Sequence, residues 1–370
     1  MHATVRRGLL AALFGLILVA QAMSTTPARA GTYVYVGNAD SNDIHILALD
    51  LKNGDLTPVD KVVVPGITKP GGSMPLAISP DRRILYAGLR GDPLVAASFM
   101  IDPLSGKLTH LANGKLADSM AYIATDRTGR FLLGASYGGN KISVNPISPQ
   151  GFVLPPQQVV ATKPNAHAIL TDPANRFVLA TSLGGDIVVQ QRFDPATGML
   201  TPNDPSSTGV KAKAGPRHFV FHPNNKLVYL INELDGSIYV FDYDAVGGKL
   251  KEKQVASALP PGHAGKIWAA DLHITPDGRF LYGSERASST LAGFAVDGET
   301  GTLKPIGSFE TEKVPRGFNI DPTGRYLLAV GQESHAMSSY AVDQATGKLT
   351  KLKQYPMGKN PNWVEIVSLP

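Results

Sequence analysis

GPRHFVFHPNNKLVYLINELDGSIYVFDYDAVGGKL, residues 215–250, contains three short apolar runs separated by turn sequences. The turns are Pro-Asn-Asn, Asp-Gly and a final Gly-Gly-Lys, and these residue types favour tight reversals of the chain. Apolar runs of this length between turns are typical of β-strands. Near-copies of the segment recur along most of the chain, so the segment is one unit of a repeat.

The period of the repeat is measured from the turn that follows the first apolar run of each copy. Successive turns of this kind lie roughly 46–53 residues apart. They stand at Ser79-Pro80, Asp126-Arg127, Asp172-Pro173, His222-Pro223, Thr275-Pro276 and Asp321-Pro322. A second turn, of the form Asp-x-x-[Thr/Ser]-Gly-x-Leu, closes the third run, as in Asp297 to Leu303. A unit of this length holds four short strands, which is the size of one propeller blade.

The two ends of the chain predict how the ring closes. Residues 32–64 match a blade that lacks its first strand, and residues 361–368 match the first strand of a blade. We therefore predict an all-β, seven-bladed β-propeller over residues 31–370, with the N- and C-terminal strands sharing one blade. Such sharing leaves no inner edge unpaired. The pattern shows no second domain.

Residues 1–30 have the pattern of a secretory signal peptide. Arg6 and Arg7 precede an uncharged apolar run over residues 8–20, and Ala28-Arg29-Ala30 has the small residues of a cleavage site. The run is too short for a lasting membrane span, so we expect no stable membrane insertion after cleavage and a periplasmic or secreted product. A retained anchor is the alternative, and the arginine pair does not identify the export route.

Charge and cysteine content exclude several classes of function. The chain has a formal charge of +5, and loss of Arg6, Arg7 and Arg29 with the leader lowers it to +2, because no acidic residue precedes Asp40. A near-neutral product gives no support to a nucleic-acid partner. Cysteine is absent, so an exported chain has no disulfides. Without cysteines or clustered carboxylates we predict neither a metal site nor a cofactor.

Charged residues recur at two positions of the repeat. Six residues before the aligned turn residue stand Met74, Ala121, His167, Arg217, Ala270, Arg316 and Asn362. Ten residues after it stand Arg90, Tyr137, Leu183, Glu233, Arg286 and Gln332. The first position lies on the strand that lines the central channel of a propeller, and the second lies in the loop after the next strand. Because those two strands run antiparallel, both rings should lie at one end of the channel, which we call the mouth.

The mouth residues predict the chemistry of the site. We expect the catalytic set to be His167, Arg217, Glu233, Arg286 and Arg316, and the substrate-binding set to be Arg90, Tyr137, Gln332 and His335. Guanidinium groups match carboxylate and phosphate oxygens, so the ligand should be anionic or polyhydroxylated. Either His167 or Glu233 can act as general base. The cations that follow each aligned turn, such as Arg279, are expected to be solvated at the opposite end.

Several segments in chain order carry a resemblance to a known family. They are Gly215-Pro216-Arg217-His218, Asn232-Glu233-Leu234, Asp271-Leu272-His273, Pro315-Arg316-Gly317-Phe318 and Gly331-Gln332 followed by His335. Together the segments resemble the seven-bladed propeller lactonases, among them the propeller-type 6-phosphogluconolactonase and the fungal carboxymuconate lactonizing enzyme. The resemblance implies hydrolysis of a small-molecule lactone without a metal, at a mouth formed by the five catalytic residues above.

Two features leave the function open. An exported enzyme is poorly placed to meet a phosphorylated sugar lactone, so a non-phosphorylated aldonolactone fits better. The alternatives are a lactone-forming cycloisomerase of the muconate type and a non-catalytic propeller that binds a polymer or protein at its rim. The sequence indicates no oligomeric state.

Overall fold

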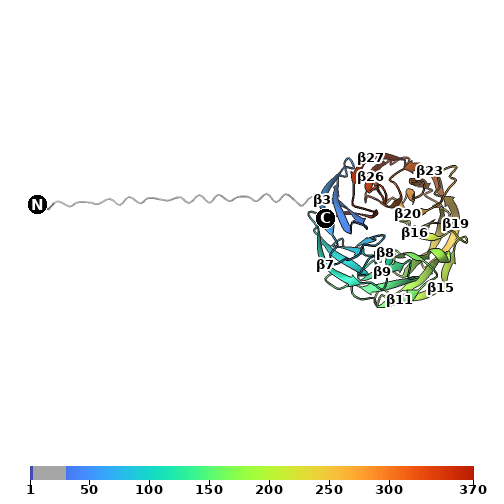
Figure 1. Cartoon of the computed structure of the whole chain (residues 1–370), viewed down its shortest axis with the longest axis horizontal. Coiled ribbons are helices and arrows are strands. Elements are labelled where there is room, and N and C mark those ends of the chain that lie inside the picture. The colour runs from blue at the N-terminus through green and yellow to red at the C-terminus, as the bar shows by residue number, and fades with distance from the viewer. Residues whose placement is uncertain (3–30) are drawn as a thin grey trace.

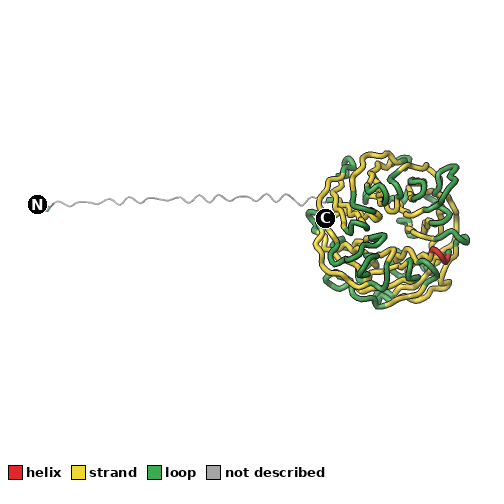
Figure 2. Tube along the Cα trace, in the orientation of Figure 1, coloured by secondary structure: helices red, strands yellow, loops and turns green. Residues whose placement is uncertain are grey.

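The computed structural model describes residues 1–2 and 31–370, so all but the first two residues of the predicted signal peptide lie outside the described residues. Residues 31–370 form seven four-stranded antiparallel sheets arranged as a ring (Figure 1). In this part of the chain the one helical element is the single turn η1 (Leu183–Gly185), drawn red in Figure 2. No helix of the described residues is long and apolar enough to cross a membrane.

Blades are numbered by their place along the chain, and the strands of each blade are given in order from the strand nearest the axis to the outermost strand. Blade 1 has the order β28 (Pro361–Ser368), β1 (Thr32–Asn38), β2 (Asp43–Leu49), β3 (Leu56–Val63). Blades 2 and 3 are β4 (Leu76–Ile78), β5 (Ile84–Gly88), β6 (Val95–Ile101), β7 (Leu108–Lys115), then β8 (Met120–Thr125), β9 (Phe131–Ser136), β10 (Lys141–Pro146), β11 (Gln158–Ala161). Blades 4 and 5 are β12 (Ala166–Thr171), β13 (Phe177–Ser182), β14 (Ile187–Phe193), β15 (Leu200–Gly209), then β16 (Pro216–Phe221), β17 (Leu227–Asn232), β18 (Ser237–Asp244), β19 (Lys249–Ser257). Blades 6 and 7 are β20 (Ala269–Ile274), β21 (Phe280–Glu285), β22 (Thr290–Val296), β23 (Leu303–Glu310), then β24 (Pro315–Ile320), β25 (Tyr326–Gly331), β26 (Ala336–Val342), β27 (Leu349–Pro356).

The ring closes as the sequence predicts. In blade 1 the last strand of the chain, β28, pairs antiparallel with β1, matching Thr32 to Ser368 and Val34 to Ile366. A side-chain hydrogen bond of 2.8 Å between the Thr32 and Ser368 hydroxyls adds to this pairing. The prediction of an all-β seven-bladed propeller with a shared terminal blade is therefore confirmed.

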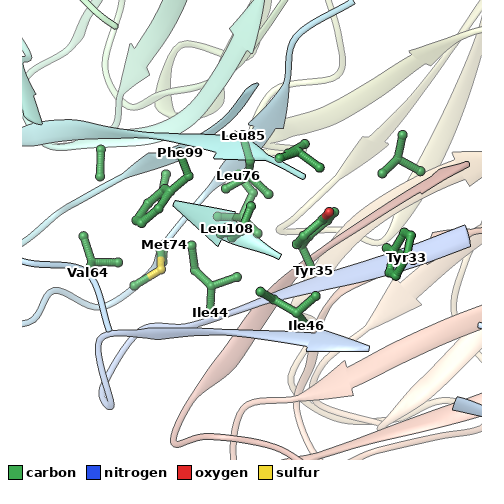
Figure 3. Close-up of a cluster of buried hydrophobic side chains, with 14 of the residues drawn as sticks. Tyr33, Tyr35, Ile44, Ile46, Val64, Met74, Leu76, Leu85, Phe99 and Leu108 are labelled. Atoms are coloured by element: carbon green, nitrogen blue, oxygen red, sulfur yellow. The ribbon is translucent and has the colours of Figure 1, made fainter. Parts of the chain in front are cut away.

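Apolar side chains between neighbouring blades form the core. Between blades 1 and 2, for example, Tyr35, Ile46, Leu85 and Phe99 are buried in one cluster (Figure 3). All residues of the second strands β9, β13 and β17 are buried, because each such strand is covered on both faces by the adjoining sheets. The outer strands, seen at the periphery in Figure 1, bury few residues and carry many exposed side chains, as in β23.

The repeated outer turn docks each blade onto the preceding one. In blade 6, the Asp297 carboxylate accepts hydrogen bonds from the backbone N–H and the hydroxyl of Thr300, at 3.0 and 2.9 Å. Gly301 has a φ of +72°, and a Cβ built there would lie 2.0 Å from Leu227 of blade 5. Its carbonyl accepts a 2.9 Å hydrogen bond from the Tyr229 hydroxyl of the same blade. Glycine is required here both for the left-handed backbone and for the close approach.

The cations that follow the aligned turns are exposed, and some of them also join blades. Arg176 of blade 4 donates to the carbonyl of Ala245 at 2.5 Å, and Arg279 of blade 6 donates to the carbonyl of Gln344 at 2.7 Å. Both acceptors lie in the outer turn of the next blade. Their position at the end away from the mouth matches the prediction, whereas the links between blades are a finding of the structure.

Candidate active site

A β-bulge at the mouth end places the first ring of predicted residues. Six of the seven inner strands (β8, β12, β16, β20, β24 and β28) show a register shift there. In blade 5 the shift leaves Arg217 out of the pairing between Pro216 and His218, and in blade 7 it leaves Arg316 out between Pro315 and Gly317. A bulge breaks the alternation of side chains and redirects the extra residue, a device common beside active sites.

An arginine–glutamate–arginine cluster forms the centre of the site. Glu233, just after β17, accepts Arg217 Nε at 2.8 Å and Arg286 Nη2 at 2.9 Å, both on Oε2. Its other oxygen accepts the indole N–H of Trp268 at 3.2 Å. Backbone carbonyls hold the arginines as well: Arg217 donates to Ala270 at 2.5 Å. The structure thus brings together residues of blades 5 and 6 from both predicted rings.

Charge and burial inside this cluster oppose each other. Burial disfavours the charged form of Glu233, but Arg217 and Arg286 outweigh it and lower the pKa of its carboxyl. Burial, followed by the neighbouring Arg217, lowers the pKa of Arg286 to about 9 although Glu233 favours its charge. The Arg286 guanidinium also lies 3.9 Å from the centre of the Trp268 ring, a cation–π contact that helps to hold it in place. Glu233 is therefore an ionised anchor for two arginines.

Two further arginines leave the site with an excess of positive charge. Arg316 has no hydrogen bond or ion pair with any described residue, and burial together with the nearby guanidiniums holds its pKa well below its usual range. Arg90 donates to the hydroxyls of Ser119 at 3.2 Å and Ser73 at 3.1 Å. Its pKa is lowered by burial and by Arg217. Four guanidiniums thus face one carboxylate, and an anion bound among them would relieve the repulsion.

His167 and Tyr137 adjoin the arginines from blades 3 and 4. His167 lies on β12 and is 4% exposed, and its Nδ1 atom is buried without a hydrogen-bond partner among the described residues. Burial, and then the positive charge of Arg217 and other neighbours, holds the pKa of His167 well below its usual range. The ring of Tyr137 meets that of His167 edge-on at 5.9 Å. His167 is therefore a neutral imidazole beside Arg217, Arg286 and Arg316.

Gln332 and His335 follow β25 in blade 7, and among the described residues they form no hydrogen bond or ion pair with the arginines or His167. Gln332 Nε2 donates to the side-chain oxygen of Asn360 at 2.6 Å, and the exposed His335 accepts the backbone N–H of the same residue at 3.2 Å. Asn362 of the inner ring also donates to Asn360, at 2.7 Å. The predicted substrate-binding set therefore divides into Arg90 and Tyr137 within the cluster and two residues at its edge.

Sequence reasoning missed a second layer of polar residues beneath the mouth. His218 Nδ1 lies 2.7 Å from Asp271 Oδ1, and His273 Nε2 lies 3.3 Å from Asp271 Oδ2. Trp268, which the sequence pattern did not assign to the site, hydrogen-bonds Glu233. The sequence offered no signal for this layer, because it depends on the bulge, which lets two consecutive residues of an inner strand serve the site where regular alternation predicts one.

Two further observations concern the mouth: whether its residues could hold a metal, and where the protein has a large cavity. Among the described residues, no three or more histidine, aspartate or glutamate side chains are placed to hold a metal ion. A cavity of about 590 Å³ lies at the opposite end, between blades 2 and 3, where Ser79, Tyr86 and Arg130 line it. It contains none of the predicted site residues. We place the candidate site at the mouth because the charge, the neutral histidine and the partnerless guanidinium occur together there.

Comparison of the sequence with known proteins identifies the family of the chain. The family model described as a seven-bladed β-propeller lactonase matches residues 64–366. The chain belongs to the propeller lactonases. This propeller-lactonase chain is 42% identical over 334 residues to the 6-phosphogluconolactonase of Yersinia pestis (strain Pestoides F), which covers 90% of the chain and 97% of the relative. It is 41% identical over 336 residues to the 6-phosphogluconolactonase of Pectobacterium carotovorum, covering 91% of the chain and 98% of the relative.

Two solved structures resemble this propeller lactonase over almost their whole length. The periplasmic gluconolactonase PpgL of Pseudomonas aeruginosa superposes with a TM-score of 0.84 at 28% identity, covering 92% of this chain and all of that one. A putative 6-phosphogluconolactonase of Bacteroides fragilis superposes with a TM-score of 0.82 at 28% identity, covering 93% of this chain and 99% of that one. The family relation and the fold thus agree with the resemblance in the sequence.

Proposed function

We propose that the protein is an exported lactonase that hydrolyses a sugar-derived lactone without a metal, with His167 as general base. The observation that carries the proposal is a buried, neutral imidazole next to three guanidiniums, two of which are paired with one ionised carboxylate. A neutral base beside concentrated positive charge suits the attack of water on an ester carbonyl, because the base takes a proton while negative charge develops on oxygen.

The contacts of the two candidate bases favour His167 over Glu233. Both oxygens of Glu233 accept hydrogen bonds, from Arg217, Arg286 and Trp268, and the two arginines lower its pKa. A carboxylate held in this way is a weak base whose lone pairs are already used. His167 has no such partners, so it is free to accept a proton from a water molecule.

The reaction balances with residues of the site alone. Water adds to the lactone carbonyl carbon as His167 takes one of its protons, which gives a tetrahedral oxyanion. Arg316, whose guanidinium has no protein partner, stabilises that oxyanion. The bond from the carbonyl carbon to the ring oxygen then breaks, and the leaving oxygen receives the proton from His167. The product acid ionises to a carboxylate, for which Arg90 and Arg316 supply positive charge. The guanidiniums supply the positive charge that a metal would supply elsewhere.

We assign the substrate to the non-phosphorylated aldonolactones. The signal-peptide pattern of residues 1–30 supports export, and the structural neighbour PpgL is named a periplasmic gluconolactonase. The relatives at 41–42% identity are named 6-phosphogluconolactonases, which supports the phosphorylated lactone instead. The site charge suits either compound, so the choice rests on the leader.

The test is acid release measured in a pH-stat with glucono-1,5-lactone and, separately, its 6-phosphate. We expect the purified protein to hydrolyse the unphosphorylated lactone above the spontaneous rate and to lose no activity in EDTA. Arg316→Ala should lower kcat by about 10²-fold or more, since removal of one oxyanion donor costs about that factor. The matched control is Arg279→Ala, an arginine of the opposite end, which should leave the rate unchanged.

Each part of the proposal has an outcome against it. A protein inert toward a panel of lactones would support the non-catalytic binding propeller. Faster hydrolysis of the 6-phosphate would reverse the substrate assignment, and equal losses in Arg316→Ala and Arg279→Ala would contradict the placement of the site at the mouth.

A further inference from the structure

Beneath the mouth, Asp271, His218 and His167 lie in a row across three inner strands. Asp271 on β20 is 2.7 Å from Nδ1 of His218 on β16. The His218 ring in turn meets that of His167 on β12 with centres 5.0 Å apart. All three residues are at most 8% exposed. Only His167 belongs to the charged cluster, so the other two call for a separate explanation.

One nitrogen on each histidine is buried without a partner among the described residues: Nε2 of His218 and Nδ1 of His167. Buried polar atoms are rarely left unpaired, because each loses its hydrogen bonds to water on folding. Ring centres 5.0 Å apart leave room for a direct N–H···N hydrogen bond after a small ring rotation, or for one bridging water. A single hydrogen bond, with one proton between Nε2 of His218 and Nδ1 of His167, gives both nitrogens a partner.

The position of that proton follows from the charges at the two ends of the row. Asp271 is ionised, since His273 and His218 outweigh its burial and hold its pKa well below the usual range. An ionised carboxylate only accepts hydrogen bonds, so His218 must be protonated on Nδ1. Burial and Arg217 lower the pKa of His218 to about 4, so at neutral pH the ring carries that single proton and Nε2 is an acceptor. His167 must then be protonated on Nδ1.

We propose that Asp271 and His218 are positioning residues that fix the tautomer of His167, so that its Nε2 atom carries the lone pair that accepts the proton of the attacking water. This inference rests on the lactonase function proposed above. When His167 becomes charged, its Nδ1–H faces a neutral acceptor backed by a carboxylate, which offsets the repulsion from the guanidiniums. An aspartate behind a catalytic histidine plays this part in other hydrolases; here a second imidazole stands between them.

Neighbouring residues hold the His218 ring and the Asp271 carboxylate in fixed orientations. The ring of His218 meets that of Tyr122 edge-on at 5.1 Å and that of Trp363 at 5.9 Å, so aromatic walls fix its plane. The Asp271 carboxylate accepts the backbone N–H of Leu272 at 3.0 Å and of Phe318 at 3.2 Å, which fixes its orientation. A rigid support of this kind is what a fixed tautomer requires.

The first test reads the tautomers directly, in the resting full-length protein with 15N-labelled histidine. Two-bond 1H–15N correlation spectra distinguish a ring protonated on Nδ1 from one protonated on Nε2, and substitution of each histidine assigns its signals. We expect Nδ1–H at both His167 and His218. A wild-type His167 protonated on Nε2 would overturn the inference. An inactive protein that still shows Nδ1–H at both rings would overturn the lactonase proposal and support the row of contacts.

The second test removes one member of the row at a time. His218→Phe keeps a ring between the aromatic walls but offers no acceptor, and Asp271→Asn removes the negative charge. Both should shift His167 away from the Nδ1–H form and lower kcat by about 10²–10⁴-fold, the usual contribution of a general base. KM should stay within about twofold, since the binding arginines are intact.

A matched control is His222→Phe, the same substitution four residues along the chain but at the opposite end of blade 5. It should change neither kcat nor the His167 signals. If His218→Phe folds and leaves both the tautomer and kcat unchanged, His218 does not position His167.

Discussion

At the scale of single residues, His167 is kept neutral in a position where a positive charge would be costly. Burial and the guanidiniums of Arg217, Arg286 and Arg316 around it all disfavour an imidazolium. A base of this kind is weak in equilibrium terms but fully available at neutral pH. As the proposed base, His167 would be a weaker acceptor of protons but fully deprotonated at neutral pH.

The pH profile tests this directly. The pKa of His167 lies well below its usual range, so kcat/KM should be flat through neutral pH and fall only in acid, as the imidazole becomes protonated. His167→Gln should lower kcat by about 10²–10⁴-fold. Rates measured between pH 4 and 8 decide the matter, and a profile that falls already at pH 7 would contradict the neutral environment.

Stability should depend on pH through the same residues. In the unfolded chain a histidine titrates near pH 6.5, whereas the pKa of buried His218 is about 4 and that of His167 is also lowered. Below pH 6.5 the unfolded state therefore binds more protons, and each of these histidines removes about 1.4 kcal/mol of stability per pH unit until its folded pKa is reached.

One carboxyl opposes this acid-side loss of stability. Burial raises the pKa of Glu365 to about 7, so between pH 7 and about 4.5 the folded state holds an extra proton there and gains stability as the pH falls. Urea unfolding at pH 6.5 and 5.0 should show a net loss of about 2 kcal/mol. His218→Gln should reduce the loss, and Glu365→Gln should enlarge it. No change in the free energy of unfolding over this range would refute the assignment.

At the scale of elements, two devices recur in the blades: the outer turn with its glycine, and the bulge at the mouth. The sequence predicted the first as a motif, since its spacing is regular, but the reason for the glycine appears only in the contacts with the neighbouring blade. The second is not visible in the sequence, because a bulge is a matter of register between two strands. For this reason the arginines of the mouth were predicted, whereas His218 and Asp271 were not assigned to the site.

The turn of blade 6 offers a matched pair of glycines for a stability test. Gly301 has a positive φ and packs against Leu227, whereas a Cβ at Gly298, three residues earlier, would meet nothing within 4 Å. Gly301→Ala should therefore destabilise the fold by about 1–3 kcal/mol, and Gly298→Ala should be neutral or slightly stabilising. Chemical denaturation of both variants measures the difference, and equal stabilities would show that the turn does not hold blades 5 and 6 together.

At the scale of the whole molecule, the ring decides which residues can meet. The five catalytic candidates come from positions up to about 150 residues apart in the chain, yet they adjoin one another because the blades repeat the same geometry. The number of blades and the shared terminal blade follow from the period and from the two ends, so the sequence was sufficient for both. Gln332 shows the limit of this reasoning, since a repeat position does not state how far a side chain reaches.

Removal of the closing strand tests the ring as a unit. Without residues 361–370, β1 loses the partner that pairs with it from Thr32 to Asn38 and becomes an open edge. We expect the truncated chain to aggregate and to show no lactonase activity, because unpaired edges template association. Light scattering and the pH-stat assay measure both effects. Deletion of the exposed Pro370 alone is the control, and a soluble, active protein lacking β28 would contradict the role given to closure.

The pairing of Thr32 with Ser368 also means that blade 1 cannot be completed until synthesis of the chain is almost finished. These partners are 336 positions apart, and a ribosome that adds about 5–20 residues per second needs roughly 20–70 s to travel from one to the other. For most of that interval the first three strands have been made but lack their inner neighbour. The final folding step therefore waits for the end of translation, and any chaperone or export factor that requires an unfinished chain has that time in which to capture it.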